Sequence, residues 1–270
     1  MFSFFKPQKI KADLSFIGVD MHSHLLPDLD DGLQHMEDTV RFIGELQELG
    51  YEKLICTPHT LAEVHPNTPL TILPRLAEVR AALKKQNINF PIDAASEYMT
   101  DMSLEEKIAQ DYPLLTFGKD HNYILVEMSY LAESSNIENL IFHLQAKGLQ
   151  PILAHPERYN YYHGNMAYYH RIKDLGCLMQ SNLLSFAGYY GKPVQVAVEK
   201  LAKENLIDLL GTDMHHERHL KALKDLAAQA SFLKKIDRLP IQNRVLFMDE
   251  GKEVVSTEIP RYFRENAMPS

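Results

Sequence analysis

Histidine and carboxylate residues occur in pairs at short spacing, where two side chains can act on one ion. His22 and His24 stand two positions apart, and so do Asp213 and His215. On extended backbone, residues two apart point to the same side, so each pair can share a metal ion. Imidazole and carboxylate ligands without thiolate suit Mn²⁺, Zn²⁺ or Fe²⁺. One such pair arises easily by chance, so a metal site is indicated only if the fold brings several of these residues together.

The residues that could do this chemistry follow apolar runs with the length of β-strands. The runs cover residues 16–21, 53–57, 91–95, 123–126, 150–154, 178–181 and 207–211, and segments with helical periodicity cover 36–49, 70–86, 137–147, 166–175, 192–204 and 219–235. Strands that alternate with helices imply βα units and a parallel sheet. Seven units without a change in composition predict an α/β fold that closes into a barrel. We expect one domain over residues 1–270, with an N-terminal arm over 1–15 and an irregular tail over 247–270.

Six of the seven predicted strands end in a histidine or a carboxylate. In a βα barrel, the active site is built from the carboxyl ends of the strands. The candidate metal ligands at these ends are His22, His24, His59, Glu97, Glu127, His155, Asp213 and His215. These are too many ligands for one ion, so two or three ions are expected. Closely spaced metal ions polarise a phosphate and activate a bridging water, which is an arrangement that cleaves phosphoesters.

The composition limits the classes of partner. The formal net charge is −8, from 36 acidic and 28 basic residues, which argues against nucleic acid as a partner. A polyanionic substrate would need metal ions to supply positive charge. Cys56 and Cys177 lie in apolar runs and are expected to be buried free thiols. No apolar run approaches the length of a membrane span, so we expect a cytoplasmic protein without membrane insertion; its oligomeric state is not predicted.

The motifs resemble those of the bacterial tyrosine-protein phosphatases found in capsule and exopolysaccharide operons, within the polymerase-and-histidinol-phosphatase (PHP) superfamily. The segment DMHSHLLPDLDDG at 20–32 resembles the opening motif of that family, and TPH at 57–59, SEY at 96–98, VEMS at 126–129, AHPERY at 154–159 and TDMH at 212–215 follow in the family's order. The resemblance extends over about residues 18–235. Its Asp-Asp-Gly and His-Pro-Glu-Arg-Tyr elements are specific to this branch of the superfamily.

The resemblance implies a distorted, seven-stranded, TIM-like barrel of the PHP fold with a trinuclear centre, usually of manganese. It implies the following partition of ligands: His22, His24, Glu97 and Asp213 on one ion, Glu97, Glu127 and His155 on a second, and Asp31, His59 and His215 on a third. Arg158 stands at the family's position for a phosphate-binding arginine. Arg218 is the candidate for the second such arginine, although it lies closer to His215 than the family spacing, and His216 or His219 can take part of that role.

The implied activity is removal of phosphate from phosphotyrosine in a protein, by direct attack of a metal-bound hydroxide and without a phosphoenzyme. Arg158 would bind two phosphate oxygens; its structural alternative is a salt bridge with Glu157 or another acid. His59, an arginine or a metal would assist the leaving phenolate. Neither cysteine lies in a phosphate-binding loop, so a thiolate nucleophile is not expected. The implied partner is a cytoplasmic bacterial tyrosine kinase of polysaccharide export.

Two aromatic segments flank the expected mouth of the site, at residues 159–162 and 186–190. Tyr159 and its neighbours are expected at the surface, where they would either stack on a phosphotyrosine ring or pack the loops. Three other functions compete with the tyrosine phosphatase. They are a related enzyme such as a histidinol phosphatase or nuclease, a metal-stabilised regulatory protein without catalysis, and a metal-dependent deamidase or lactonase.

Overall fold

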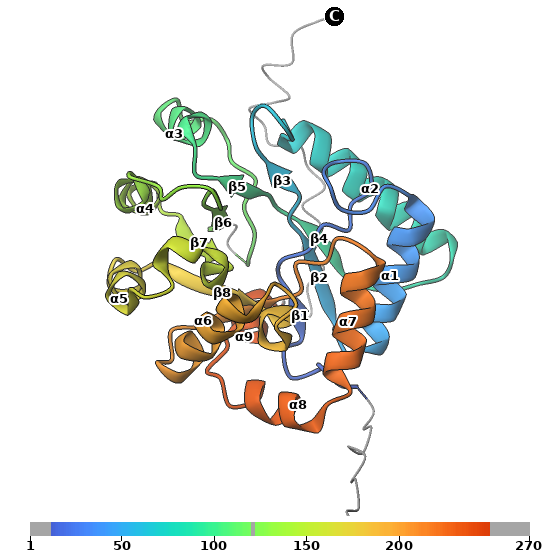
Figure 1. Ribbon diagram of the computed structural model, residues 1–270. Helices are drawn as coiled ribbons and strands as arrows, with labels where there is room; N and C mark the ends of the chain where they lie inside the picture. Colours follow the sequence, from blue (N-terminus) through green and yellow to red (C-terminus); the bar gives the residue numbers. More distant parts are fainter. Residues whose placement is uncertain (1–11, 120–121, 249–270) are drawn as a thin grey trace, which may run out of the picture.

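The computed structural model describes residues 12–119 and 122–248. Its strands lie in the middle of the molecule, and the helices surround them on the outside (Figure 1). The tail expected from residue 247 lies outside the described residues after 248, and so does the expected N-terminal arm up to residue 11.

The strands form two parallel sheets. One has the order β1 (Val19–Asp20), β2 (Lys53–Cys56), β4 (Ile92–Ala94), and the other has the order β3 (His59–Thr60), β5 (Glu97–Met99), β6 (Tyr123–Glu127), β7 (Gln150–Ala154), β8 (Leu178–Asn182), β9 (Leu209–Gly211). Each predicted run contains one of these strands, so the parallel α/β prediction is confirmed. Strands β3 and β5 were not predicted. Strand β3 follows β2, and β5 follows β4, each after a short break in the strand. The first break contains Pro58, which has no N–H to donate to a neighbouring strand.

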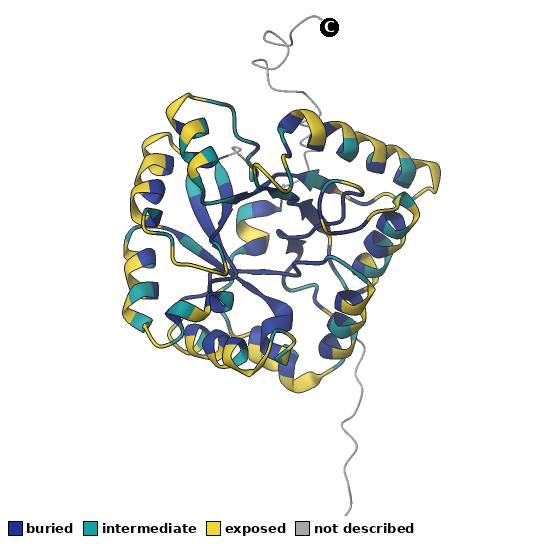
Figure 2. Ribbon diagram, turned by 45° about the horizontal axis from the view of Figure 1, so that its top comes forward, coloured by how far each residue is buried: buried dark blue, intermediate teal, exposed yellow. Residues whose placement is uncertain are grey.

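The helices bury their inward faces and expose their outward faces (Figure 2). They are α1 (Met36–Glu48), α2 (Pro69–Lys85), α3 (Met102–Ala109), α4 (Ile137–Ala146), α5 (Met166–Asp174), α6 (Lys192–Lys203), α7 (Glu217–Ala227), α8 (Ala230–Ile236) and α9 (Asn243–Phe247), with short 3₁₀ turns η1 (Pro156–Arg158), η2 (Asn160–Tyr162) and η3 (Leu183–Ala187). The helix predicted over 219–235 is two helices, because Gln229 adopts extended backbone between them. Helix α3 was missed. In the described part of the chain, no helix has the length and apolar character that crossing a membrane requires.

The strands carry two separate apolar cores, one on each face. The larger core packs the strands against the helices. The smaller core collects side chains that point to the other face, from β1, β2, β6, β7 and β9: Val19, Ile55, Leu125, Ile152 and Leu209. Because successive residues of a strand point to opposite faces, these residues place the two sheets around a common interior.

Side chains join β1 to β9, where no strand ladder is present in the described residues. The amide of Asn243 donates to the carbonyls of Val19 and Leu210 at 2.9 and 2.7 Å, and its oxygen accepts from the N–H of Leu210. Asp20, the last residue of β1, accepts from the backbone N–H and the hydroxyl of Thr212, the first residue after β9, at 2.9 and 2.6 Å. An isolated bridge between Ser23 and Met214 continues this junction. The first and last strands are thus held together at the edge that carries the candidate site.

Candidate metal centre

Four overlapping groups of His, Asp and Glu side chains come from the first residues of β3 and β5, the last residue of β6, and the loops after β1, β7 and β9. Within each group the ligand atoms lie within 4.8 Å of one another. The groups are His24, Asp31, His59 and His215; His22, Glu97 and His155; His22, His24 and Asp213; and His59, Glu97 and Glu127. Their nine members are the nine residues that the sequence analysis proposed as metal ligands. The structure therefore brings the whole predicted set into one cluster.

Glu97 lies at the centre of this cluster, fully buried. Its Oε2 atom lies 3.0 Å from Nδ1 of His59, and 3.3 and 3.4 Å from Nε2 of His22 and His24. Its Oε1 atom lies 3.1 Å from Nε2 of His155. A carboxylate with nitrogen ligands around both oxygens is suited to bridging two cations.

The tautomers of His22 and His24 favour a cation between them. Nδ1 of His22 donates to Oε1 of Gln180 at 2.7 Å, and Nδ1 of His24 donates to Oδ2 of Asp30 at 2.7 Å. With both protons on Nδ1, the two Nε2 atoms present lone pairs to one another at 3.2 Å. Two facing lone pairs repel unless a positive charge lies between them, and a metal ion supplies that charge.

The charge balance of the cluster also fits divalent cations. Burial raises the pKa of Glu97, but the neighbouring His22 and His59 outweigh it and hold that pKa well below its ordinary value. The pKa of Asp213 is likewise lowered, against burial, by His22 and His215. Without a metal, these carboxylates keep their charge only by drawing protons onto the histidines. Cations would replace those protons, as they do when metal ligands are deprotonated on binding.

Two buried carboxylate oxygens of the cluster accept no hydrogen bond of acceptable geometry, although histidine nitrogens lie within 3.4 Å of one of them. They are Oε2 of Glu97 and Oε2 of Glu127, both without a hydrogen-bond partner in the described structure. A buried polar atom without a partner is costly, and a bound cation would satisfy both oxygens. The residues present therefore fit a site for two or three divalent ions, whose donors are nitrogen and oxygen only.

Two members of the cluster have a left-handed backbone conformation, which residues other than glycine rarely adopt. His155 has φ 33° and ψ 56°, and Asp213 has φ 49°. His155 is the first residue after β7 and Asp213 is the second after β9, and both turn their side chains toward the cluster. Strain of this kind costs about 1–3 kcal/mol per residue and concentrates at functional sites.

Arg158 lies beside the cluster. Its Nη1 donates to Oδ2 of Asp213 at 2.8 Å, and the amide of Asn182 donates to the same oxygen at 2.7 Å. Glu157 is not the partner of Arg158: its Oε1 accepts from the N–H of Asn182 and from the hydroxyl of Ser185. The guanidinium thus forms a salt bridge with an acid of the cluster, and that bridge fixes it at the edge of the site.

The expected surface position of Tyr159 is wrong, whereas the phosphate-binding role predicted for Arg218 stays a prediction. Arg218 is exposed in the first turn of α7, and it makes no hydrogen bond or ion pair with the described residues. Tyr159 is fully buried; its hydroxyl donates to the carbonyl of Ala154 and accepts from the N–H of Met128. That hydroxyl ties the end of β7 to the end of β6, so the ring cannot stack on a substrate.

Two histidines of the same segment, His219 and His216, lie near the cluster. His219 is buried, and its Nδ1 accepts from the N–H of His215 at 3.3 Å. Burial and the charge of His216 lower the pKa of His219 to about 3, so this ring is neutral at ordinary pH. His216 begins α7, where its Nδ1 accepts from the N–H of His219. The neutral ring of His219 does not supply the positive charge that a second arginine would bring.

Sequence reasoning missed the residues that orient the ligands. Asp30 accepts from Nδ1 of His24 and from the N–H groups of Gly32 and His59. Gln180 and Asn182 form a hydrogen-bonded chain from His22 to Asp213. They lie on β8, which was the predicted strand without a ligand at its end. Asp30 stood in the Asp-x-Asp-Asp-Gly motif, so a signal for it was present.

The two cysteines stand apart from the chemistry. Cys56 and Cys177 are free and buried, as expected. Burial raises the pKa of each thiol to about 12. Both thiols therefore stay protonated at neutral pH, which agrees with the expectation that no thiolate nucleophile is used.

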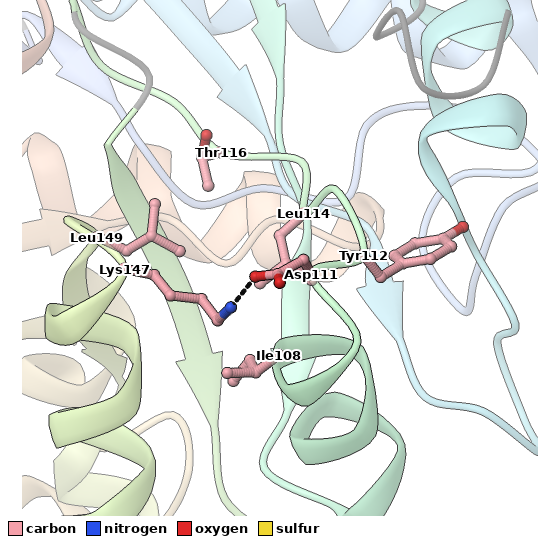
Figure 3. A pocket seen from close by; sticks show the side chains of 7 residues that line it. All are labelled: Ile108, Asp111, Tyr112, Leu114, Thr116, Lys147 and Leu149. Atoms are coloured by element: carbon pink, nitrogen blue, oxygen red, sulfur yellow. Dashed lines mark hydrogen bonds and ion pairs between the residues drawn. The ribbon is translucent and has the colours of Figure 1, made fainter. Parts of the chain in front are cut away.

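A separate cavity lies near the start of β7, away from the cluster. Figure 3 shows the side chains that line it. Its volume is about 420 Å³. It is lined by Ile108, Asp111, Tyr112, Leu114, Thr116, Lys147 and Leu149, with an ion pair between Asp111 and Lys147. Leu149 precedes β7, whereas His155 follows it. The cavity is thus no part of the metal cluster.

The chain is similar to known proteins in sequence and in structure. The family described as capsular polysaccharide synthesis, CpsB/CapC, matches residues 18–255. Tyrosine-protein phosphatase YwqE of Bacillus subtilis (strain 168) is 28% identical over 198 residues, which cover 73% of this chain and 77% of that protein. Tyrosine-protein phosphatase CpsB of Streptococcus pneumoniae is 25% identical over 243 residues, which cover 86% of this chain and 99% of that protein.

Solved structures agree with these relatives. A structure of YwqE from Bacillus subtilis and CpsB from Streptococcus pneumoniae, described as unique metal-dependent tyrosine phosphatases, matches with a TM-score of 0.72 at 26% identity, over 82% of this chain and 89% of that chain. An amidohydrolase from Mycoplasma synoviae matches with a TM-score of 0.51 at 14% identity, over 90% of this chain and 91% of that chain. The lactonase Lmo2620 from Listeria monocytogenes matches with a TM-score of 0.52 at 10% identity, over 86% and 92%. At such low identity, the last two share the fold alone.

Proposed function

The chain belongs to the capsular polysaccharide synthesis family CpsB/CapC, and on that basis we propose that it is a metal-dependent protein-tyrosine phosphatase. The observation that carries this proposal is the cluster of nine His, Asp and Glu side chains with Arg158 fixed at its edge. The relatives named as tyrosine-protein phosphatases support the reaction and the substrate class.

We propose that the cluster holds two or three ions, with manganese preferred and Fe²⁺ or Zn²⁺ as alternatives. His22, His24 and Asp213 would hold one ion, with Glu97 bridging to a second ion near Glu127 and His155; Asp31, His59 and His215 would hold a third. Bound ions of this kind supply Lewis acidity to the phosphate and activate water for attack. The geometric groups support part of this partition: one joins His22, His24 and Asp213, and another joins Asp31, His59 and His215 with His24. Glu97 belongs to two further groups, one with His22 and His155 and one with His59 and Glu127, which agrees with a bridging role for it.

Within this scheme, the protein's own groups bind and orient the phosphate. Arg158 would donate to phosphate oxygens as charge accumulates on them in the transition state. Asp213 fixes the guanidinium through Oδ2, while its Oδ1 faces the nitrogens of His22 and His24 at 3.5 and 3.3 Å. His59 has carboxylates near both ring nitrogens, with Glu127 2.8 Å from Nδ1 and Asp31 3.6 Å from Nε2. This environment favours a ligand role for His59 over the role of acid for the leaving group.

We also propose that the described residues form one domain, in which the two sheets close into a distorted barrel. The shared inner core and the side-chain junction between β1 and β9 support closure. The proposed setting is the cytoplasm, where the substrate would be a phosphotyrosine-bearing protein such as a tyrosine kinase of polysaccharide export.

The competing function is hydrolysis of a small phosphate ester, as in a histidinol phosphatase. To test this, the manganese-loaded protein is assayed with a tyrosine-phosphorylated peptide and with histidinol phosphate side by side. We expect the peptide to be hydrolysed preferentially, and Asp213→Ala to abolish both reactions. Asp28→Asn, an exposed change outside the cluster, serves as the control that keeps activity. Preference for histidinol phosphate would refute the protein substrate, and absence of both reactions in the metal-loaded protein would refute the phosphatase.

A further inference from the structure

Two tyrosine rings pack on the guanidinium of Arg158. The rings of Tyr130 and Tyr190 have their centroids 4.6 and 4.5 Å from its Cζ atom. Arg158 follows β7, which lies between β6 and β8 in the sheet. Tyr130 lies in the loop after β6, and Tyr190 lies in the loop after β8. The topology therefore brings one ring to the guanidinium from the loop on each side.

The rings and Asp213 leave one part of the guanidinium open. A cation is attracted to the face of an aromatic ring. The rings of Tyr130 and Tyr190 therefore pack against the guanidinium and shield it from solvent where they contact it. Of its five N–H donors, only one donates to an acceptor within the described residues, and that acceptor is Asp213. The side chain is 24% exposed. An anion can thus reach the remaining N–H groups along the edge of the guanidinium, which is the direction of bidentate phosphate binding.

This open edge lies next to the metal cluster. Oδ2 of Asp213 accepts from Arg158 and from Asn182, whereas Oδ1 of the same carboxylate faces the histidine nitrogens of the cluster. An oxyanion bound at the cluster would therefore lie within the reach of Arg158. A long arginine side chain held by one salt bridge keeps much of its rotational freedom, and two stacked rings remove that freedom before the anion arrives.

We propose that Tyr130 and Tyr190 are positioning residues that hold Arg158 with its free N–H edge toward an oxyanion bound at the metal cluster. This inference rests on the proposed function for the identity of that oxyanion, a phosphate monoester. The ring of Tyr130 has a second neighbour: its hydroxyl lies 3.2 Å from Nε2 of His155. The effects of ring and hydroxyl are separated by comparing leucine and phenylalanine variants.

The test measures binding of inorganic phosphate to the manganese-loaded full chain by calorimetry. Tyr130→Leu and Tyr190→Leu are each expected to weaken phosphate binding by roughly three- to tenfold, because each removes one cation–π contact. Tyr130→Phe and Tyr190→Phe keep the ring and are expected to bind phosphate like the wild type. Tyr112→Leu is the matched control, since Tyr112 lines the cavity near the start of β7 (Figure 3). The metal content of every variant is measured alongside.

A double-mutant cycle shows whether the rings act through Arg158. In an Arg158→Met background, Tyr190→Leu is expected to cause no further loss of phosphate binding. If a leucine variant loses its metal or does not fold, Tyr190→Met replaces it, because methionine fills space without a ring face. Wild-type binding in the leucine variants, or an equal loss in the Arg158→Met background, would overturn the proposal. Ring-dependent phosphate binding in a chain that hydrolyses no phosphate ester would instead refute the proposed function and leave this inference standing.

Discussion

Asp30 is outside the metal-ligand groups, yet its carboxylate positions two of their members. One oxygen accepts from Nδ1 of His24 at 2.7 Å and from the N–H of His59 at 2.9 Å. In Asp30→Asn, the new NH₂ group would face either the donors of His24 and His59 or, if the side chain turns the other way, the N–H of Gly32, so at least one hydrogen bond is lost in either orientation. We expect metal affinity to fall about 10- to 100-fold, measured by competition with a fluorescent chelator.

The matched control for this change is Asp28→Asn, in the same loop. Asp28 is exposed and has φ 60°, a conformation that asparagine tolerates. Its metal affinity should equal that of the wild type. Unchanged affinity in Asp30→Asn would show that the ligands keep their orientation without this carboxylate.

Asp20 gives stability a pH dependence of its own. Burial raises its pKa from 3.8 to about 6, against the hydrogen bonds from Thr212. The folded state therefore holds a proton that the unfolded state releases, so this contribution to stability is present below pH 4 and is lost as the pH rises to about 6. We expect the wild type to lose about 1 kcal/mol relative to Asp20→Asn between pH 5 and pH 7. Urea unfolding of both proteins at the two pH values measures the difference, and parallel pH profiles would contradict it.

The ligands could be predicted from single residues, whereas the groups that orient them could not. A His or carboxylate near the end of a strand has one place to go in a parallel fold, so the strand-end residues could be predicted to gather in one cluster, which the resemblance completed with Asp31. Gln180, Asn182 and Tyr130 have side chains that serve equally well in loops and cores. Only their distances to His22, Asp213 and Arg158 reveal what they do.

At the level of elements, β9 approaches β1 and β8 so closely that its last residue must be small. An ideal Cβ on Gly211 would lie 2.8 Å from Cβ of His22 and 2.8 Å from Nε2 of Gln180. We expect Gly211→Ala to destabilise the protein by about 1–3 kcal/mol through overpacking and to weaken metal binding by displacing His22. Chemical denaturation and a metal titration measure the two effects.

Gly44→Ala is the paired control for this change. Gly44 lies within α1, and a Cβ there meets no atom within 4 Å. Because glycine is a poor helix former, alanine should stabilise the protein by about 0.5–1 kcal/mol. If both alanine variants behaved alike, close packing at the end of β9 would not be the cause.

The seven strands within apolar runs were predicted, whereas the two short strands that follow β2 and β4 were not. The apolar runs located seven strands correctly, because burial on both faces demands continuous apolar sequence. The passage of the chain from β2 to β3 and from β4 to β5 was not predicted, since each second strand has only two or three residues and begins with a polar ligand. The division of the helix at Gln229 was also missed, because neither glycine nor proline marks it.

For the molecule as a whole, the buried cluster predicts that removal of its metal ions lowers the thermal stability of the protein. Buried carboxylates of Glu97 and Glu127 would lose the cations that offset their charge, while the unfolded chain binds no metal in that geometry. At free metal about a thousandfold above Kd, binding adds about 4 kcal/mol, so chelation should lower Tm by roughly 10 °C. Differential scanning calorimetry with and without EDTA measures this shift.

The His215→Ala variant should show a smaller effect of EDTA, because one ligand group is already incomplete. Equal melting temperatures with and without chelator in the wild type would mean that the folded cluster holds no metal.

The fold class followed from the alternation of strands and helices. The inner core and the junction between β1 and β9, however, depend on Phe247 and Asn243, which carry no local signal of that role.

The junction between the first and last strands also bears on how the protein is made. Asp20 and Thr212 meet across 192 positions of sequence, and the ligand groups that contain His22 and His24 include Asp213 and His215. During synthesis, the ribosome adds His22 and His24 to the chain long before it adds Asp213 and His215. The centre can therefore be assembled only when synthesis has passed β9, and a prematurely terminated chain would carry most of the ligands without the catalyst.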